Sequence, residues 1–347
     1  MITSSRPSWR RLSSYGLASL GVLIELTGCT FEVAIELDQQ AETFVQAPLD
    51  QVDVLWVIDD TATMAGAQEQ LIEQFGSFAE VLDGAGIGYQ MEVVTTSSGP
   101  WDGEGWSPDT SDEAIYTAEW GSAGSFAERL RVGTSGSDKE RGLSAALLAL
   151  TVDGGEPPEA PRLVREDADL LVVFVTDEDD CSDDGALSDD SPTSCYTSQE
   201  RLVPVGEIVE ALIDVHDDVN RVLVAGILGT EASGCPDVYP GTRYQRVARA
   251  TGGWVADICG EDWSGALERL GAHATGLRDS FRLQRAAEPG SVAVYVDQLE
   301  LFEDPQEGFT YDPETWLVRF APDAVPARGA TIRIEYVRDM SRFVPAY

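Results

Sequence analysis

Two short segments rich in carboxylates and hydroxyls follow two strongly apolar runs of the sequence. Segment 59–63 (DDTAT) comes directly after the apolar run 54–58, and segment 177–180 (DEDD) comes after the run 168–176. Carboxylate and hydroxyl oxygens are the ligands that Mg²⁺ and Ca²⁺ prefer. If both runs are strands of one parallel sheet, the two segments meet at its carboxyl edge, where such sheets bind ligands. The two segments therefore predict a site for a divalent cation.

The elements expected around these segments alternate between strands and helices. Continuous apolar runs are typical of strands that are buried on both faces. Apolar residues at helical spacing, such as Leu71, Phe75 and Phe78, form the buried face of a helix. The order predicts an α/β fold over residues 51–282, with a doubly wound, mostly parallel sheet flanked by helices. The expected strands are 54–58, 89–95, 168–176, 221–228 and 254–258, and the expected helices are 65–82, 140–150, 202–215, 244–251 and 262–281.

Two parts of the chain depart from this alternation. Residues 97–132 are rich in Gly, Ser, Asp and Trp, and we expect them to form an insertion that lies as a loop on the surface. Residues 283–347 contain short segments of alternating apolar and polar residues, with turn residues between them. They predict a small C-terminal antiparallel β domain. Its expected strands are 292–296, 316–320 and 331–336.

The segment 57–64 (VIDDTATM) resembles the Asp-x-Ser-x-Ser loop of von Willebrand factor type A domains, with threonines in place of the serines. In that family the loop supplies a carboxylate and two hydroxyls to a metal-ion-dependent adhesion site, and an aspartate after a later buried strand adds another ligand. The resemblance covers about residues 51–282 and implies the same fold. It implies that Asp59, Thr61, Thr63 and Asp177 bind Mg²⁺ or Ca²⁺, and that the cation binds a carboxylate of a protein partner.

The family also places a threonine in a third loop, ahead of a helix. Here the loop has the sequence GTSGSDKE over residues 133–140, and its spacing to the helix does not fit Thr134. Glu140 lies nearest the start of the helix, and we expect it to be the further ligand. A third carboxylate favours Ca²⁺ over Mg²⁺ and weakens the pull of the cation on an acidic partner.

Other interpretations of these acidic residues remain open. An aspartate before a helix is often only an N-cap, which would account for Asp59 taken alone. Asp180, Ser182 and Asp184 fit the start of an EF-hand loop, but a serine stands where the bidentate glutamate belongs. The carboxylates after Asp177 form either a second, irregular cation site or a solvated turn.

Residues 1–28 have the pattern of a lipoprotein signal peptide. Three arginines precede an apolar stretch that is shorter than the about 20 residues needed to span a bilayer. The residues before Cys29 resemble a bacterial lipobox, so we expect lipidation of Cys29 and a polar tether over residues 29–50. The implied location is the cell envelope, with a lipid anchor in a membrane, on the periplasmic or surface side of the outer membrane. An ordinary secretory signal and a twin-arginine signal are the alternatives.

Four further cysteines allow three pairings. The simplest pairs join sequence neighbours, Cys181 with Cys195 and Cys235 with Cys259. Each disulfide would stabilise the fold by about 3 kcal/mol in an oxidising compartment. A zinc site is a weaker hypothesis, because the chain has no Cys-x-x-Cys and only two histidines.

Composition and motifs limit the function further. The chain has 61 acidic and 23 basic residues and a net charge of −38, which repels nucleic acid and anionic lipid. It lacks the Gly-x-Ser-x-Gly elbow of hydrolases and a phosphate-binding loop, since Lys139 is its single lysine. We therefore expect a lipid-anchored binding protein without enzymatic activity. The alternatives are a metal- and disulfide-stabilised scaffold module of an envelope complex, and a hydrolase with an unrecognised site.

Overall fold

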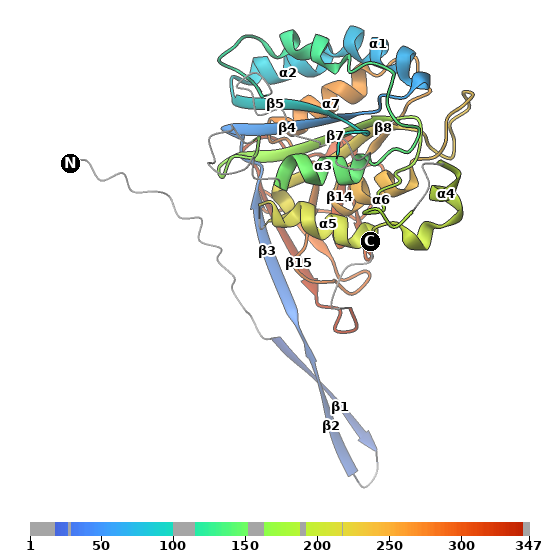
Figure 1. The fold of residues 1–347 in the computed structure, drawn as a ribbon. Coiled ribbons are helices and arrows are strands. Elements are labelled where there is room, and N and C mark those ends of the chain that lie inside the picture. The colour runs from blue at the N-terminus through green and yellow to red at the C-terminus, as the bar shows by residue number, and fades with distance from the viewer. Residues whose placement is uncertain are drawn as a thin grey trace, which may run out of the picture. The chain divides into compact units, whose positions relative to one another are not determined.

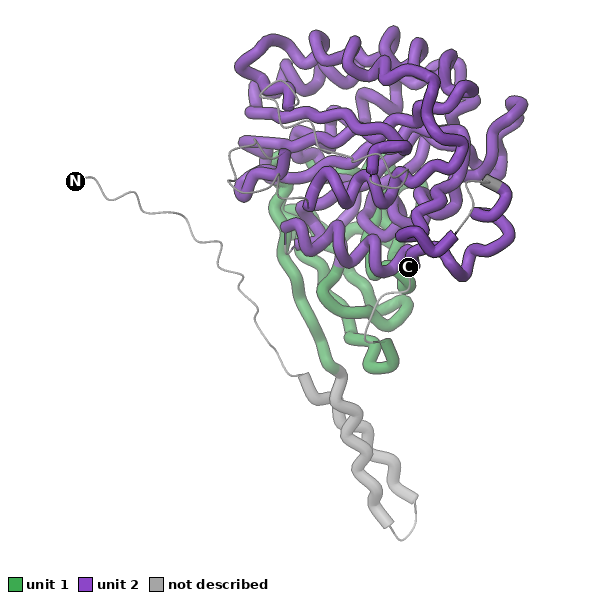
Figure 2. The backbone as a smooth tube through the Cα atoms, in the orientation of Figure 1, with its two compact units in different colours: residues 1–46, 283–345 green, residues 47–282, 346–347 purple. Residues whose placement is uncertain are grey.

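A computed structural model describes residues 18–26, 29–99, 115–151, 163–187, 192–216 and 218–342, with the backbone alone for residues 18–37. The chain divides into two compact units (Figure 2). Unit 1 combines residues 1–46 with 283–345. Unit 2 combines residues 47–282 with 346–347 and contains the segments that predict the cation site.

Unit 2 is built on a six-stranded sheet (Figure 1). Its strands, in spatial order, are β6 (Tyr116–Thr117), β5 (Gly88–Thr95), β4 (Gln51–Ile58), β7 (Asp169–Thr176), β8 (Val222–Leu228) and β9 (Val255–Asp257). Neighbouring strands are parallel, except that β6 is antiparallel to β5. The first strand, β4, lies between β5 and β7, so the chain reverses its direction of winding there. Ligands bind at such a point in open α/β sheets, beyond the carboxyl ends of the strands.

Helices cover both faces of this sheet (Figure 1). One face carries α1 (Ala65–Gln74), α2 (Gly76–Ala85), the 3₁₀ helix η3 (Ala123–Leu130) and α7 (Ser264–Ala274). The other carries α3 (Gly142–Thr151), α5 (Val205–Asp214) and α6 (Thr242–Ala250). The expected α/β class, with a mostly parallel sheet flanked by helices, is confirmed. Shorter elements of unit 2 are η1 (Ala62–Met64), α4 (Pro192–Thr197), η4 (Gln199–Arg201), η5 (Val219–Arg221) and β10 (Ser280–Arg282).

The central strand β4 shows why the sequence has a continuous apolar run here. Trp56 and Ile58 pack into the core under α1 and α2, whereas Leu55 and Val57 pack under α3 and α5. Alternate side chains of a strand point to opposite faces of its sheet. A strand covered by helices on both faces must therefore be apolar at nearly every position.

The helix expected over residues 65–82 is two helices. α1 ends at Gln74 and α2 begins at Gly76, although Phe75 between them keeps helical backbone angles (φ −56°, ψ −24°). Phe75 and Phe78 both contact the ring of Trp56, with centroids 5.5 Å apart in each case. The apolar face thus continues across the break, which is why the spacing of apolar residues did not predict it.

The prediction that residues 97–132 form a surface loop is wrong for the second half of this segment. Residues 100–114, including Trp101 and Trp106, lie outside the described residues. Residues 115–132 contain β6 and η3, and Phe126 and Leu130 of η3 are fully buried in the core. This part of the segment belongs to the packed fold because η3 packs against α1, α2 and β5.

Unit 1 contains antiparallel strands, as expected for the C-terminal residues. A four-stranded sheet has the order β12 (Leu299–Leu301), β11 (Ala293–Val296), β15 (Thr331–Val337) and β3 (Gln39–Val45). β13 (Phe309–Asp312) pairs with β14 (Leu317–Phe320), and 3₁₀ helix η6 (Pro322–Ala324) follows. The expected tether is therefore wrong over residues 39–45, which form β3. This strand is polar because it lies at an edge of the sheet, where β15 supplies its hydrogen-bonding partner on one side.

The predicted signal peptide and the lipidation site fall largely on residues whose side chains the structure does not describe. Residues 1–17 and 27–28 are not described, and β1 (Ala18–Leu26) pairs with β2 (Cys29–Leu37) in a separate two-stranded sheet. Lipidation of Cys29 therefore stays a prediction. Within the described ranges, no helix has the length and the apolar character that a bilayer span requires.

Both expected disulfides are confirmed. Cys181 is bonded to Cys195 and Cys235 to Cys259, with Cα atoms 5.3 Å and 5.6 Å apart respectively. Disulfides persist in oxidising compartments outside the cytosol. The pairing of sequence neighbours closes two short loops in unit 2, and the first of them begins four residues after the acidic Asp177.

Candidate metal centre

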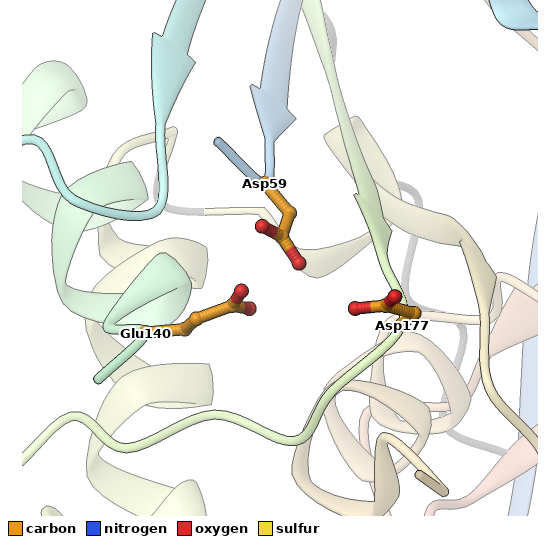
Figure 3. A group of neighbouring side chains, drawn as sticks. All are labelled: Asp59, Glu140 and Asp177. Carbon is orange, nitrogen blue, oxygen red and sulfur yellow. The ribbon is translucent and has the colours of Figure 1, made fainter. Parts of the chain in front are cut away.

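Three buried carboxylates meet beyond the carboxyl ends of β4 and β7 (Figure 3). Asp59 follows β4, Asp177 follows β7, and Glu140 lies two residues ahead of α3. One oxygen of each carboxylate lies within 4.8 Å of the others. The exposed fractions of the three residues are 0%, 5% and 1% respectively. The group is thus a compact set of oxygen ligands at the reversal point of the sheet.

The strand register brings Asp59 to this place. Ile58 of β4 lies opposite Val175 of β7, and the backbone N–H of Asp59 donates to the Val175 carbonyl over 3.0 Å. The ladder therefore extends one residue past β4. Asp59 is held rigidly beside the end of β7, so its carboxyl group faces that of Asp177.

The loop after β4 folds around the Asp59 carboxylate. Oδ1 of Asp59 accepts hydrogen bonds from the backbone N–H and the hydroxyl of Thr61, both over 2.7 Å. The hydroxyls of Thr61 and Thr63 lie 3.1 Å apart, and the Thr63 hydroxyl also hydrogen-bonds the Asp177 carboxyl. Gln68 of α1 donates to the backbone carbonyl of Asp59 over 2.9 Å, which ties the loop to this helix. Both predicted threonines therefore lie at the acidic group, with Thr61 buried and Thr63 exposed.

Thr176, the last residue of β7, is a member of the site that the sequence did not reveal. Its hydroxyl lies 2.8 Å from Oδ2 of Asp59 and 2.7 Å from Oε2 of Glu140. It also accepts a hydrogen bond from the backbone N–H of Glu178 over 3.1 Å. A single hydroxyl proton cannot satisfy two carboxylates at once. Thr176 therefore bridges the two acids without neutralising either of them.

Two carboxylate oxygens of the group lack a donor among the residues that the structure describes. Oε1 of Glu140 and Oδ1 of Asp177 are buried and have no hydrogen-bond partner among the described residues. A buried polar atom of this kind costs free energy unless something else satisfies it. Carboxylate oxygens directed at one another, with hydroxyls beside them, form the donor set that Mg²⁺ and Ca²⁺ take.

Burial and the like charges raise the pKa values of these acids when no cation is present. Burial, and then the charge of Asp59, raises the pKa of Asp177 to about 6. Burial, and then hydrogen bonding and the charge of Asp59, raises the pKa of Glu140 well above its ordinary value. Glu178, at the edge of the group, has its pKa raised to about 7 by burial and by the charges of Asp177 and Asp59. A bound divalent cation would supply the positive charge that these acids lack.

The remaining acids of the 177–183 segment have structural roles. Asp179 accepts hydrogen bonds from the Thr242 hydroxyl and the Arg243 N–H at the start of α6. Asp180 accepts the N–H of Leu143 in the first turn of α3 over 2.9 Å, and pairs with the Arg243 guanidinium over 3.0 Å. Each carboxylate thus satisfies free N–H groups of a helix N-terminus. The EF-hand interpretation is wrong, because the Asp180 oxygens are occupied by these protein donors.

Asp183 forms a buried ion-pair cluster with two basic residues next to Glu140. It pairs with Lys139 over 3.1 Å and with Arg141 over 3.0 Å, and all three side chains are almost fully buried. These pairs, and the backbone N–H of Leu187, lower the pKa of Asp183 despite its burial. The single lysine of the chain is therefore a structural residue. The alternative of a solvated turn does not hold for this segment, because Asp179, Asp180 and Asp183 are buried and a disulfide closes it.

The third loop brings Glu140, and not Thr134, to the acidic group. Thr134 is exposed, whereas the backbone carbonyl of Glu140 accepts the N–H of Cys181 over 2.7 Å. Gly136 of the same loop packs so closely against Asp60 that a Cβ atom at this position would overlap the Asp60 carboxyl. The loop is thus fixed at both ends, and Glu140 points towards Asp59 (Figure 3).

Comparisons with known proteins do not assign the chain to a family. No protein-family model matches it, and no curated protein matches its sequence. Solved structures give low similarity. Human COPII-coat protein Sec24c has a TM-score of 0.41 at 12% identity, covering 88% of this chain and 42% of that chain. The pilus adhesin SpaC from Lactobacillus rhamnosus GG has a TM-score of 0.40 at 12% identity, covering 92% and 43%.

Proximal thread matrix protein 1 from the mussel byssus has a TM-score of 0.34 at 13% identity, covering 70% of this chain and 51% of that chain. The chain thus spans about half, or less, of the length of these three proteins. At these scores the likeness carries no argument about function. The function has to be inferred from the acidic group itself.

Proposed function

We propose that unit 2 is a divalent-cation-binding module of the von Willebrand factor A type, and that it binds a protein partner through the face that carries the cation. The ligands are Asp59, Thr61, Thr63, Asp177 and Glu140. The observation that carries the proposal is the pair of buried carboxylate oxygens, on Glu140 and Asp177, that have no partner among the described residues. Binding, rather than catalysis, is the role we assign to this site.

The donor set favours Ca²⁺ over Mg²⁺. Three carboxylates and two hydroxyls offer more oxygen ligands than Mg²⁺ takes from protein, because Mg²⁺ keeps several waters in a near-octahedral shell. Ca²⁺ takes six to eight oxygens with flexible geometry. The loop sequence and the position of the site between β4 and β7 support the family assignment, since the family motif matches at Asp59, Thr61, Thr63 and Asp177.

We also propose that the protein is exported and held in the cell envelope by a lipid on Cys29. The lipobox-like residues before Cys29 support the anchor. The two disulfides support an oxidising compartment.

Calorimetric titration with Ca²⁺ and Mg²⁺ tests the cation site. We expect the wild type to bind one cation and Asp59→Asn to lose at least about tenfold in affinity, which corresponds to about 1.4 kcal/mol. Asp60→Asn is the matched control, because the Asp60 carboxyl faces Ser97 over 2.8 Å and lies outside the acidic group. Equal affinities for the two variants, or no binding by the wild type, would contradict the proposal.

A second candidate function is a scaffold module in which the cation only stabilises the fold. The nearly complete burial of Asp59, Glu140 and Asp177 favours it, because little of the acidic group faces solvent. Affinity capture of envelope proteins, with and without EDTA, separates the two functions. Partners that remain bound in EDTA, while the thermal midpoint falls, would favour the scaffold.

A further inference from the structure

An exposed pair of tyrosines lies beside the acidic group. Tyr196 and Tyr239 are 40% and 50% exposed, and their ring centroids lie 6.0 Å apart with planes inclined at 43°. Large aromatic side chains exposed side by side are typical of binding surfaces. We call Tyr196, Tyr239 and the neighbouring Glu178 the tyrosine rim.

The fold holds both rings against the segment that carries Asp177. The backbone N–H of Tyr239 donates to the Asp177 carbonyl over 2.7 Å. Tyr196 follows Cys195, whose disulfide to Cys181 ties α4 to the acidic segment, and its hydroxyl hydrogen-bonds the backbone of Asp179. The two rings are therefore ordered before any partner arrives, which lowers the entropic cost of binding.

The charge around the rim stays negative when a cation is bound. Three ionised carboxylates carry −3, so a divalent cation leaves −1 on Asp59, Glu140 and Asp177 together. Glu178 and Asp138 lie close enough to add to this charge. The nearby basic residues Lys139 and Arg141 both pair with the buried Asp183, and Arg243 pairs with the buried Asp180. A carboxylate approaching this face would be repelled, whereas a basic side chain would be attracted.

We propose that the partner presents an arginine to the tyrosine rim, and does not offer a carboxylate to the cation. The inference rests on the proposed function and identifies the chemistry of the partner. A guanidinium stacks on the faces of Tyr196 and Tyr239, which attract cations through their ring quadrupoles. Its N–H groups donate to the Glu178 carboxylate at the same time. The cation then orders the loops under the rim instead of contacting the partner.

Two labelled peptides of equal length test this partner chemistry. One alternates glycine with arginine and the other alternates glycine with aspartate, and fluorescence anisotropy follows their binding to the Ca²⁺-loaded full chain. We expect the arginine peptide alone to bind. Tyr196→Ala and Tyr239→Ala should each weaken its binding by about fivefold, the size of a cation–π contact at a partly exposed site.

Three control variants separate the tyrosine rim from general attraction to an acidic protein. Tyr239→Phe keeps the ring and the backbone hydrogen bond to Asp177, and it should keep the affinity. Glu178→Gln should weaken binding, while Glu268→Gln, which removes an exposed charge on α7, should not. Loss of the same size in both glutamate variants, or no loss in either tyrosine-to-alanine variant, would show diffuse attraction and overturn the inference.

Calorimetry on the same samples keeps the two proposals distinguishable. If Ca²⁺ binds and the aspartate peptide binds in a Ca²⁺-dependent way, the arginine inference is wrong and carboxylate ligation is correct. If Ca²⁺ binds and neither peptide does, the inference is also wrong, while the cation site stands. If Ca²⁺ does not bind, the proposed function is wrong, and so is the inference that rests on it.

Discussion

Glu140 is the residue that gives the candidate site its particular character. It adds a third buried carboxylate to the acidic group, and its Oε1 has no hydrogen-bond partner among the residues that the structure describes. Its negative charge would strengthen the attraction for a cation. Without a cation, burial and the nearby Asp59 raise its pKa, so ionisation of Glu140 costs stability.

Replacing Glu140 with glutamine should therefore have two opposite effects. We expect Glu140→Gln to weaken Ca²⁺ binding by about tenfold or more, because one charge is lost. In EDTA the same variant should melt higher than the wild type, because a buried unpaired carboxyl is removed. Calorimetry and thermal unfolding measure the two effects. Glu210→Gln on the exposed side of α5 is the control, and an equal response from it would rule out a special role for Glu140.

The raised pKa of Asp177 predicts how stability depends on pH without a cation. Its pKa is 3.8 in the unfolded chain and about 6 in the fold. Between these values the folded chain binds the extra proton, so the free energy of unfolding falls as the pH rises through this window and stays lower above it. Asp177→Asn has no carboxyl group at this position, so its free energy of unfolding should not show this fall with pH. The thermal midpoint of the variant minus that of the wild type, in EDTA, should grow by several degrees between about pH 4.5 and about pH 7.5.

Saturating Ca²⁺ should reverse this dependence for the wild type. The cation binds the ionised acids, so its stabilising effect grows as Asp177 loses its proton near pH 6. The difference in thermal midpoint between Asp177→Asn and the wild type could instead stay constant with pH in EDTA. That result would mean that Asp177 has the same pKa in the fold as in the unfolded chain.

At the residue scale, the sequence predicts the ligands better than it predicts their supports. Asp59 and Asp177 could be identified because each directly follows an apolar strand. Thr176 could not be identified, because it is the last residue of β7 and the sequence does not distinguish it from the other residues of that strand. The roles of Asp180 and Asp183 were missed because their partners, Leu143 of α3 and Lys139, lie about 40 residues earlier in the chain and become neighbours only in the fold.

At the scale of elements, burial decides what the sequence predicts. β4 and β7 could be identified because both faces of each strand are covered, which makes them apolar at almost every position. β3 was missed because an exposed edge strand has no such requirement. The break between α1 and α2 was missed because Phe75 keeps helical angles and its side chain stays in the core.

The buried cluster of Asp183 ties the loop of Glu140 to the loop of Asp177, and its loss should be costly. Asp183→Asn removes the counter-charge that Asp183 supplies to the buried Lys139 and Arg141. We expect a loss of about 2–4 kcal/mol in the free energy of unfolding and weaker Ca²⁺ binding. Denaturant unfolding measures the first effect and calorimetry the second.

The next residue along the chain provides the matched control for Asp183. Asp184 is exposed and adopts a positive φ of 47°, which asparagine also tolerates. Asp184→Asn should therefore stay within about 0.5 kcal/mol of the wild type. Equal stability of the two variants would mean that the ion pairs at Asp183 contribute nothing net.

At the scale of the whole molecule, the proposed lipid anchor requires that the fold tolerate the loss of the residues before Cys29. Cleavage before Cys29 removes β1, which pairs with β2 alone in a two-stranded sheet. β3 pairs with β15 in a different sheet, so cleavage leaves this strand pairing in place. The mature chain should then keep unit 1 intact, and we expect a chain that begins at Cys29 to melt within about 2 °C of the full chain, a shift of less than about 1 kcal/mol.

Expression in a bacterial host with a lipoprotein pathway tests the anchor itself. The wild type should fractionate with membranes and carry the mass of a lipid, while Cys29→Ser should lose both the lipid and the membrane association. Cys235→Ser with Cys259→Ser controls for the general loss of cysteines, because this pair forms a disulfide in unit 2. Because a chain with a net charge of −38 is repelled by anionic lipid, the proposed anchor is the route by which it would be held at a membrane. Membrane association of Cys29→Ser equal to that of the wild type would therefore remove the anchor from the proposal and leave the cation site untouched.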